Sequence, residues 1–134
     1  MILFVCTGNT CRSPLAAALA RSRGLDAQSA GLSAYPGDPA SAPAVRIARR
    51  YGADLTGHAA RRVTRELVDQ ADAIYVMTPG HRAALCALFP HAAPRVRVLD
   101  PAIPDPYGGS DEMYARCAEA LLLAMARAGL LKGG

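Results

Sequence analysis

The N-terminal stretch of the chain joins two segments with different secondary-structure preferences. Residues 2–6, ILFVC, form a continuous apolar run with β-branched and aromatic members, which is typical of a strand buried on both faces. Residues 13–24, SPLAAALARSRG, have a serine at the cap position, a proline at the first helical position, strong helix formers and a closing glycine. These signals predict a helix. A fully buried strand followed directly by a helix indicates a parallel sheet with helical crossovers.

The rest of the chain repeats this alternation of strand and helix. Further strands are expected at residues 26–32, 71–78 and 95–100, and further helices at 43–52, 64–70, 79–89 and 110–129. The sequence therefore predicts one α/β domain over residues 1–134, with a parallel sheet covered by helices on both faces. Ligands of such folds bind at the carboxyl ends of the strands.

Charge and hydropathy exclude several classes of partner. The formal charge of +4 suits an anionic ligand or an acidic protein surface. The arginines are spread along the chain and form no basic arm, so we expect no nucleic-acid partner. No stretch approaches the ~20 apolar residues of a membrane span, and the start lacks the features of a signal peptide. We therefore expect no membrane partner and a cytoplasmic location.

The four cysteines do not predict a disulfide framework, because the chain is too large and too apolar to need one. We expect reduced thiols. A zinc site is not expected either, since Cys6 and Cys11 lack a second pair of ligands at suitable spacing.

The segment between the first strand and the first helix, TGNTCR, has the composition of an anion-binding loop. Backbone N–H groups of such a loop converge on one point, and the helix N-terminus adds partial positive charge there. Gly8 is expected to allow a tight turn, and the Arg12 guanidinium suits phosphate oxygens. The same field favours the thiolate of Cys6. This combination indicates phosphoryl transfer through a phosphocysteine. The alternative is a buried core thiol and a solvated arginine.

Two distant motifs resemble those of one known family. VCTGNTCRSP at residues 5–14 is similar to the signature of low-molecular-weight protein tyrosine phosphatases, and DPYGG at 105–109 is similar to their general-acid loop. The resemblance covers essentially the whole chain, including SAG at 29–31 and HAARRVT at 58–64. It implies the low-molecular-weight phosphatase fold, a four-stranded parallel sheet flanked by helices.

The resemblance also implies roles for individual residues. Cys6 is the nucleophile, Arg12 stabilises the transition state, and Asp105 is the general acid and then the base. The phosphoryl group, or another oxyanion, would be bound by Thr7, Gly8, Asn9, Thr10, Cys11, Arg12 and Ser13. A supporting polar network would join Asn9, Ser13, Ser29 and His58. The family uses no metal and no cofactor.

The assignment of the acid needs a choice between two Asp-Pro pairs. Asp100 ends a predicted strand and reads as a simple cap. Asp105 precedes the aromatic Tyr107 and two glycines, so we assign the acid role to it. His81 and His91 are read as ordinary packing or surface histidines.

The substrate is expected to be a phosphorylated protein side chain. The residue type at position 10, here Thr10, distinguishes the phosphoarginine-directed branch from the tyrosine-directed branch. The tyrosine-directed branch has a bulky aliphatic residue there. The branch that acts on phosphoarginine in bacterial proteins has Thr at this position, and the sequence around its general acid is similar to DPYGGS at residues 105–110 of this chain. We therefore favour phosphoarginine, with phosphotyrosine as the alternative. Tyr107 can stack on an aryl ring or a guanidinium plane. Tyr35 either contacts substrate or is a solvent-side loop residue.

The other cysteines bear on a third class, the thiol-dependent arsenate reductases of the same fold. These need a further cysteine pair on a mobile segment, whereas Cys86 and Cys117 fall inside predicted helices. Cys11 either packs beneath the loop or, as the resemblance implies, traps an oxidised Cys6 as a reversible disulfide.

Overall fold

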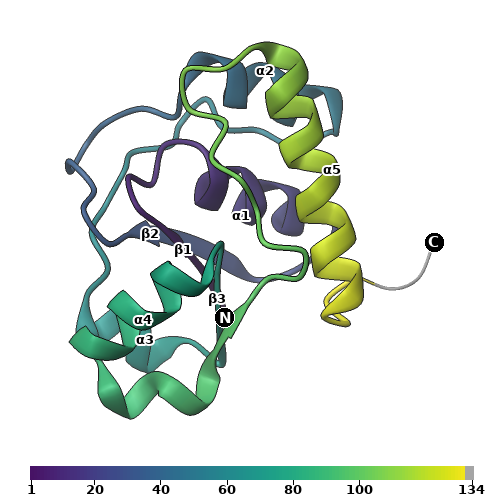
Figure 1. Ribbon diagram of the computed structural model, residues 1–134. Coiled ribbons are helices and arrows are strands. Elements are labelled where there is room, and N and C mark those ends of the chain that lie inside the picture. Colours follow the sequence, from purple (N-terminus) through teal and green to yellow (C-terminus); the bar gives the residue numbers. More distant parts are fainter. Residues whose placement is uncertain (132–134) are drawn as a thin grey trace.

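The computed structural model describes residues 1–131 and contains one sheet of parallel strands in the order β2-β1-β3-β4 (Figure 1). The strands are β1 (Ile2–Cys6), β2 (Ala27–Gly31), β3 (Ala73–Val76) and β4 (Val96–Val98). All three pairings are parallel. The predicted four-stranded parallel sheet is therefore confirmed.

Helices cover both faces of this sheet. They are α1 (Arg12–Ser22), α2 (Ala42–Arg50), α3 (Arg65–Gln70), α4 (Pro79–Leu88) and α5 (Asp111–Arg127), with a short 3-10 helix η1 (Pro90–Arg95). The core residues of α1, α2 and α5 form one buried cluster, and those of α3 and α4 form another. Figure 1 shows α1, α2 and α5 on one side of the sheet and α3 and α4 on the other.

Alternation along β1 divides its side chains between the two faces. Phe4 and Cys6 belong to the cluster of α1, α2 and α5, while Leu3 and Val5 belong to the cluster of α3 and α4. All four are almost completely buried. This is why the strand reads as a continuous apolar run, and it turns the Cys6 side chain towards α1.

The position of β1 in the sheet creates a crevice for a ligand. The chain leaves β1 through α1 to pair β2 on one side, whereas β3 pairs β1 on the other side and leads to β4. Connections from β1 and β3 thus run in opposite directions, and in open α/β sheets a ligand binds at such a point, outside the carboxyl ends of the strands. The segments that follow β1 and β3 both border it.

One local prediction was wrong, and one short element was not predicted. Helix α1 begins at Arg12 rather than Ser13, and its N-cap is Cys11, with no side-chain capping bond. The Ser13 hydroxyl points inward to other partners described below. Residues 90–95 form the unexpected 3-10 helix η1, in which Pro90 and Pro94 cannot supply α-helical N–H donors.

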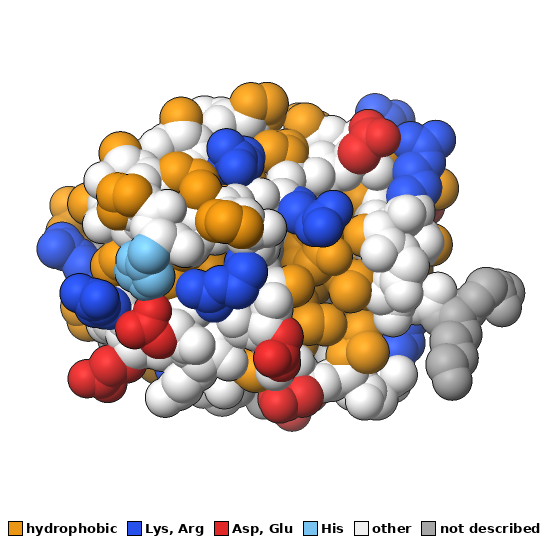
Figure 2. All heavy atoms as spheres, turned by 90° about the horizontal axis from the view of Figure 1, so that it is seen from below, with side chains coloured by type: hydrophobic (Ala, Val, Ile, Leu, Met, Phe, Trp, Pro, Cys, Tyr) orange, Lys and Arg blue, Asp and Glu red, His pale blue; other side chains and the backbone are white. Residues whose placement is uncertain are grey.

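The surface carries charges of both signs. Figure 2 shows one face on which Lys and Arg side chains lie interspersed with Asp and Glu, with apolar side chains between them. Within residues 1–131, no helix is long and apolar enough to cross a membrane.

Candidate active site

The loop between β1 and α1 wraps tightly around one point, and Asn9 makes the turn possible. Asn9 is the non-glycine residue that adopts a left-handed conformation among residues 1–131, with φ of 56°. Gly8 is not in that region. The expectation that Gly8 supplies the unusual backbone angle was therefore wrong. Asn tolerates this conformation better than most residues because its short polar side chain bonds locally.

A glycine on the neighbouring strand makes room for the loop. A Cβ atom on Gly31, at the end of β2, would lie 2.6 Å from the Thr7 carbonyl oxygen and 3.0 Å from the Asn9 nitrogen. Both neighbours are backbone atoms, so they cannot move aside as a flexible side chain would. The loop can approach β2 this closely only because residue 31 has no side chain. This glycine belongs to the SAG motif at residues 29–31, but the sequence alone indicated no role for it.

The expected supporting network is assembled around Asn9. Its Nδ2 donates to Ser13 Oγ and to Ser29 Oγ, both at 2.9 Å. His58 Nε2 lies 2.7 Å from the Asn9 carbonyl oxygen. The structure adds Arg61, whose backbone N–H donates to Asn9 Oδ1 at 3.0 Å. Burial lowers the pKa of His58, and nearby cations, Arg21 and Arg61, add to the shift.

Cys6 lies at the bottom of the loop with its sulfur held by a hydroxyl. The residue is buried, and its Sγ is 2.8 Å from Ser13 Oγ. Ser13 sits in the first turn of α1, so the sulfur also faces the positive end of that helix. A hydroxyl donor and a helix N-terminus both stabilise a thiolate. Ser13 itself is fully buried and does not line the cavity formed by the loop, although it was expected among the phosphate-binding residues.

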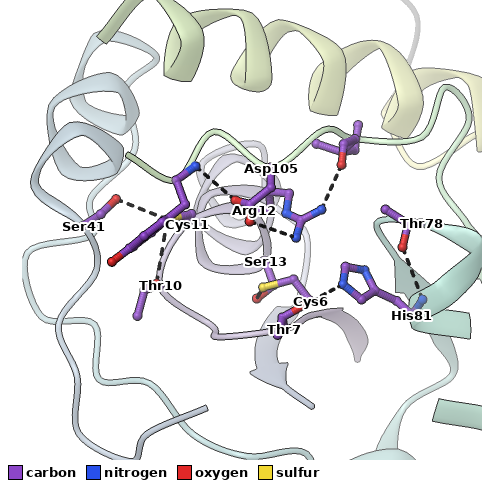
Figure 3. Close-up of polar contacts among 12 residues, drawn as sticks. Cys6, Thr7, Thr10, Cys11, Arg12, Ser13, Ser41, Thr78, His81 and Asp105 are labelled. Atoms are coloured by element: carbon purple, nitrogen blue, oxygen red, sulfur yellow. Dashed lines mark hydrogen bonds and ion pairs between the residues drawn. The ribbon is translucent and has the colours of Figure 1, made fainter. Parts of the chain in front are cut away.

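Arg12 and Asp105 meet at the mouth of the loop (Figure 3). Arg12 is buried; one of its terminal nitrogens donates to the Ile103 carbonyl at 3.0 Å, and the other lies 3.7 Å from Asp105 Oδ2. Asp105 is about half exposed and its Oδ1 accepts from the Tyr107 N–H. A carboxyl group in this place can reach both a bound phosphoryl ester and water.

Asp100 occupies a different part of the molecule. Its carboxylate lies 4.0 Å from Arg127 of α5 and lines a cavity of about 690 Å³ between β4 and α5. This cavity is larger than the one at the carboxyl end of β1, described next, but it is lined by no cysteine, serine, threonine or histidine. Because its lining offers none of these side chains, we assign the candidate active site to the other cavity.

The candidate active site is a small cavity of about 180 Å³ at the carboxyl end of β1. Its lining residues are Cys6, Thr7, Gly8, Asn9, Thr10, Cys11, Arg12, Asp105 and Tyr107. Thr10 and Tyr107, two of the expected substrate-pocket residues, thus border the same cavity. Tyr35 is an exposed loop residue and does not belong to this lining.

Cys11 is held in place by two residues that the sequence analysis did not identify, Ser41 and Tyr114. Its Sγ is 3.2 Å from the Tyr114 hydroxyl and donates to Ser41 Oγ at 3.5 Å. Tyr114 extends from α5 and is buried, and burial raises its pKa to about 12. No sequence motif linked these three residues, because α5 comes 100 residues later in the chain.

His81 was read as an ordinary histidine, yet it contacts the loop directly. Its Nε2 lies 2.9 Å from Thr7 Oγ1, which immediately follows Cys6. The sequence held one usable signal: His81 is in the first turn of the helix after a buried strand, and such positions face the ligand crevice.

The remaining cysteines lie in helices, as expected. Cys86 is half-buried in α4, and Cys117 is buried in α5. Burial raises the pKa of the Cys117 thiol to about 12. A thiol that stays protonated is a poor partner in disulfide exchange.

Comparison with known proteins agrees with the geometry. The family model described as low molecular weight phosphotyrosine protein phosphatase matches residues 1–128. The chain is 37% identical over 130 residues to a protein-arginine-phosphatase of Geobacillus stearothermophilus, covering 90% of this chain and 87% of the relative. It is also 37% identical over 120 residues to the low molecular weight protein-tyrosine-phosphatase Etp of Escherichia coli (strain K12), covering 84% and 81%.

A solved structure of the YwlE arginine phosphatase, a cysteine-to-serine mutant with a phosphorylated active-site serine, has the same fold. It matches with a TM-score of 0.88 at 32% identity, over 95% of this chain and 91% of that one. The family match spans almost the entire chain and includes the loop, the arginine and the aspartate described above. The chain is therefore a phosphatase of the low molecular weight phosphotyrosine protein phosphatase family.

Proposed function

We propose that the protein hydrolyses phosphorylated protein side chains through a phosphocysteine at Cys6, with phosphoarginine as the preferred substrate. One observation carries the mechanism: Cys6, Arg12 and Asp105 line the same cavity of about 180 Å³, with Arg12 within 3.7 Å of Asp105. A nucleophile, a fixed cation and an exposed acid around one small site are the parts that stepwise phosphoryl transfer needs.

In the first step the Cys6 thiolate attacks phosphorus. The S–P bond forms as the bond from phosphorus to the leaving nitrogen or oxygen breaks, and the protonated Asp105 carboxyl gives its proton to the leaving atom. Arg12 and the loop N–H groups hold the equatorial oxygens, where negative charge is spread in the transition state.

In the second step water attacks the phosphocysteine. The Asp105 carboxylate takes a proton from the water as its oxygen bonds to phosphorus, and the S–P bond breaks to release inorganic phosphate. The departing sulfur recovers its negative charge within hydrogen-bond distance of the Ser13 hydroxyl, 2.8 Å away. Ser13 thus favours both the attack and the release of the thiolate.

The preference for phosphoarginine rests on Thr10 and Asp105. Thr10 lines the cavity with a small polar side chain, where the tyrosine-directed branch resembled by this loop has a bulky aliphatic one. The ionised Asp105 carboxylate can pair with a guanidinium, and its protonated form can give a proton to the leaving guanidine nitrogen as the P–N bond breaks. Phosphotyrosine is the second candidate, because the arginine-directed and tyrosine-directed relatives are equally similar at 37% identity.

Arsenate reduction has less support. It requires a relay of cysteines, whereas Cys117 is buried with a raised pKa and Cys86 lies within α4.

We also propose that Cys11 protects Cys6 by forming a reversible disulfide after oxidation, and that the protein acts in the cytoplasm, where Cys6 stays reduced. Peptide mass spectrometry after mild peroxide treatment tests the disulfide, and its absence would exclude the protective role.

The decisive experiment compares peptides that carry phosphoarginine or phosphotyrosine, using wild type and Thr10→Ile. We expect wild type to have the higher kcat/KM on phosphoarginine and Thr10→Ile to shift the ratio towards phosphotyrosine, because the added bulk narrows the cavity. Thr56→Ile makes the same change in an exposed loop outside the lining and should leave the ratio unchanged. A wild-type preference for phosphotyrosine would reverse the proposed specificity.

A further inference from the structure

Thr7 and His81 come from different strand ends but meet at the same crevice. Thr7 follows β1, and His81 lies in the first turn of α4, which follows β3. Because β1 and β3 are paired in parallel, with Val5 opposite Val76, their carboxyl ends lie side by side. Figure 3 shows the His81 ring reaching towards Thr7, next to Cys6 and Arg12.

The contact between them is built into the fold. His81 is 9% exposed, its backbone N–H donates to Thr78 Oγ1 at 3.2 Å, and its Nε2 lies 2.9 Å from Thr7 Oγ1. Among residues 1–131, His81 Nδ1 is the buried side-chain nitrogen or oxygen that has no hydrogen-bond partner. An unpartnered buried polar atom is costly, and its presence beside a reactive site points to function.

The charges around the ring decide which nitrogen carries the proton. The charged groups that act on His81 are Arg12 of α1 and Asp105 of the loop before α5; burial and Arg12 lower its pKa, while Asp105 opposes the shift. The imidazole is therefore neutral at pH 7. An N–H at the unpartnered Nδ1 would be desolvated near a cation, so the tautomer with the proton on Nε2 is favoured. His81 Nε2–H then donates to Thr7 Oγ1.

This arrangement leaves the hydroxyl proton of Thr7 free. Thr7 lines the phosphate cavity, and an oxygen that accepts from His81 can still donate its own proton. We propose that His81 positions the Thr7 hydroxyl to donate a hydrogen bond to the oxyanion held in the loop, adding a side-chain donor to the backbone N–H groups. Thr7 is thus a binding residue by its side chain, and His81 is a positioning residue.

The inference rests on the proposed phosphocysteine chemistry for its effect on turnover, but not for its effect on anion binding. We expect Thr7→Val, which replaces the hydroxyl with a methyl group, to weaken binding of inorganic phosphate and lower kcat/KM for an aryl phosphate about 10-fold or more, the usual effect of losing a hydrogen bond to a charged group. Thr7→Ser should restore most of both.

His81 variants test the positioning. His81→Leu should weaken phosphate binding as much as Thr7→Val does, and adding it to Thr7→Val should cause little further loss, since both remove the same interaction. His81→Gln keeps a side-chain N–H at a similar reach and should bind phosphate nearly as wild type does. His91→Leu changes an exposed histidine that pairs with Asp69 and serves as the matched control.

A titration of wild type provides a readout that does not depend on any variant folding. Phosphate in the loop offsets the charge of Arg12, so the pKa of His81, followed by NMR, should rise when inorganic phosphate is added, while that of His91 should not. The proposal is overturned if the pKa of His81 does not move or if Thr7→Val binds phosphate as wild type does. It is also overturned if the losses of phosphate binding caused by Thr7→Val and by His81→Leu are additive. Absence of hydrolysis by wild type with these binding effects intact would instead refute the proposed function alone.

Discussion

Single residues of the loop each perform more than one task. Asn9 adopts the left-handed turn, and its side chain ties Ser13 and Ser29 to the loop. Ser13 in turn contacts the Cys6 sulfur. A change at one of these residues is therefore expected to affect both the shape of the loop and the proposed nucleophile, Cys6. Asp105 differs, because it lies outside the loop and contacts it through Arg12, at 3.7 Å.

The acid assignment is testable at this scale. Asp105→Ala should lower kcat by roughly 10²–10⁴-fold, the usual contribution of acid–base catalysis. The loss should be larger for a basic leaving group than for 4-nitrophenol, which needs little protonation. Asp100→Ala is the control, because Asp100 lies near Arg127. Steady-state kinetics decide, and a large loss in Asp100→Ala with none in Asp105→Ala would transfer the role to Asp100.

At the scale of elements, the end of β2 shapes the loop that follows β1. The two strands are in register, with Cys6 opposite Gly31. The Ser33 N–H donates to the Thr7 carbonyl and the Leu32 N–H to the Cys6 carbonyl, both at 2.9 Å. The loop is thus partly held by the backbone of the segment after β2, and at Gly31 it comes so close to β2 that a side chain there would not fit.

Gly31→Ala tests this close approach. The added Cβ would lie 2.6 Å from a backbone oxygen, so the loop must shift. We expect a loss of about 1–3 kcal/mol in the free energy of unfolding, as for other overpacked sites, and a fall in kcat of up to about 10²-fold. Chemical denaturation and steady-state kinetics measure the two effects.

Gly57→Ala is the matched control, since nothing lies within 4 Å of a Cβ there and its φ is not positive. Equal behaviour of the two variants would show that the loop has room that the structure does not indicate.

Much of the element order was predictable from the sequence, for identifiable reasons. β1 is buried on both faces and therefore apolar throughout, and the caps at Thr64 and Ser110 accept the expected N–H bonds from Leu67 and Met113. The cap expected at Ser13 failed because its hydroxyl bonds within the site. Local rules fail where a side chain serves a distant partner.

At the scale of the whole molecule, one half-buried imidazole, that of His58, and one buried imidazole, that of His81, link folding to pH. His58 and His81 both have lowered pKa values, with burial as the first cause. A histidine that resists protonation when folded binds fewer protons than in the unfolded chain. Its stabilisation is present above the unfolded pKa of about 6.5 and is lost as pH falls.

We therefore expect the free energy of unfolding to decrease as pH falls below about 6.5, measured by denaturant titration between pH 5 and 8. The paired carboxylates with lowered pKa values, such as Asp69 and Asp111, stabilise the fold throughout this range and lose that stabilisation only as pH falls below about 4. His81→Gln should reduce the slope of the free energy of unfolding against pH, whereas His91→Gln should reduce this slope less. A stability that is constant over this range would contradict the lowered pKa values of both imidazoles.

The sequence by itself determined the alternation of strands and helices and the loop between the first strand and helix, and its resemblance to a known family linked that loop to a distant aspartate motif. These features are encoded in apolar runs, in caps and in residue types that are contiguous in the chain. Only the tertiary structure decided that Asn9 rather than Gly8 makes the turn, that Gly31 makes room for it, and that Tyr114 and His81 reach Cys11 and Thr7. Such contacts join strand ends and helices far apart in sequence, so they depend on the register of the sheet and the packing of its layers, which no local pattern specifies.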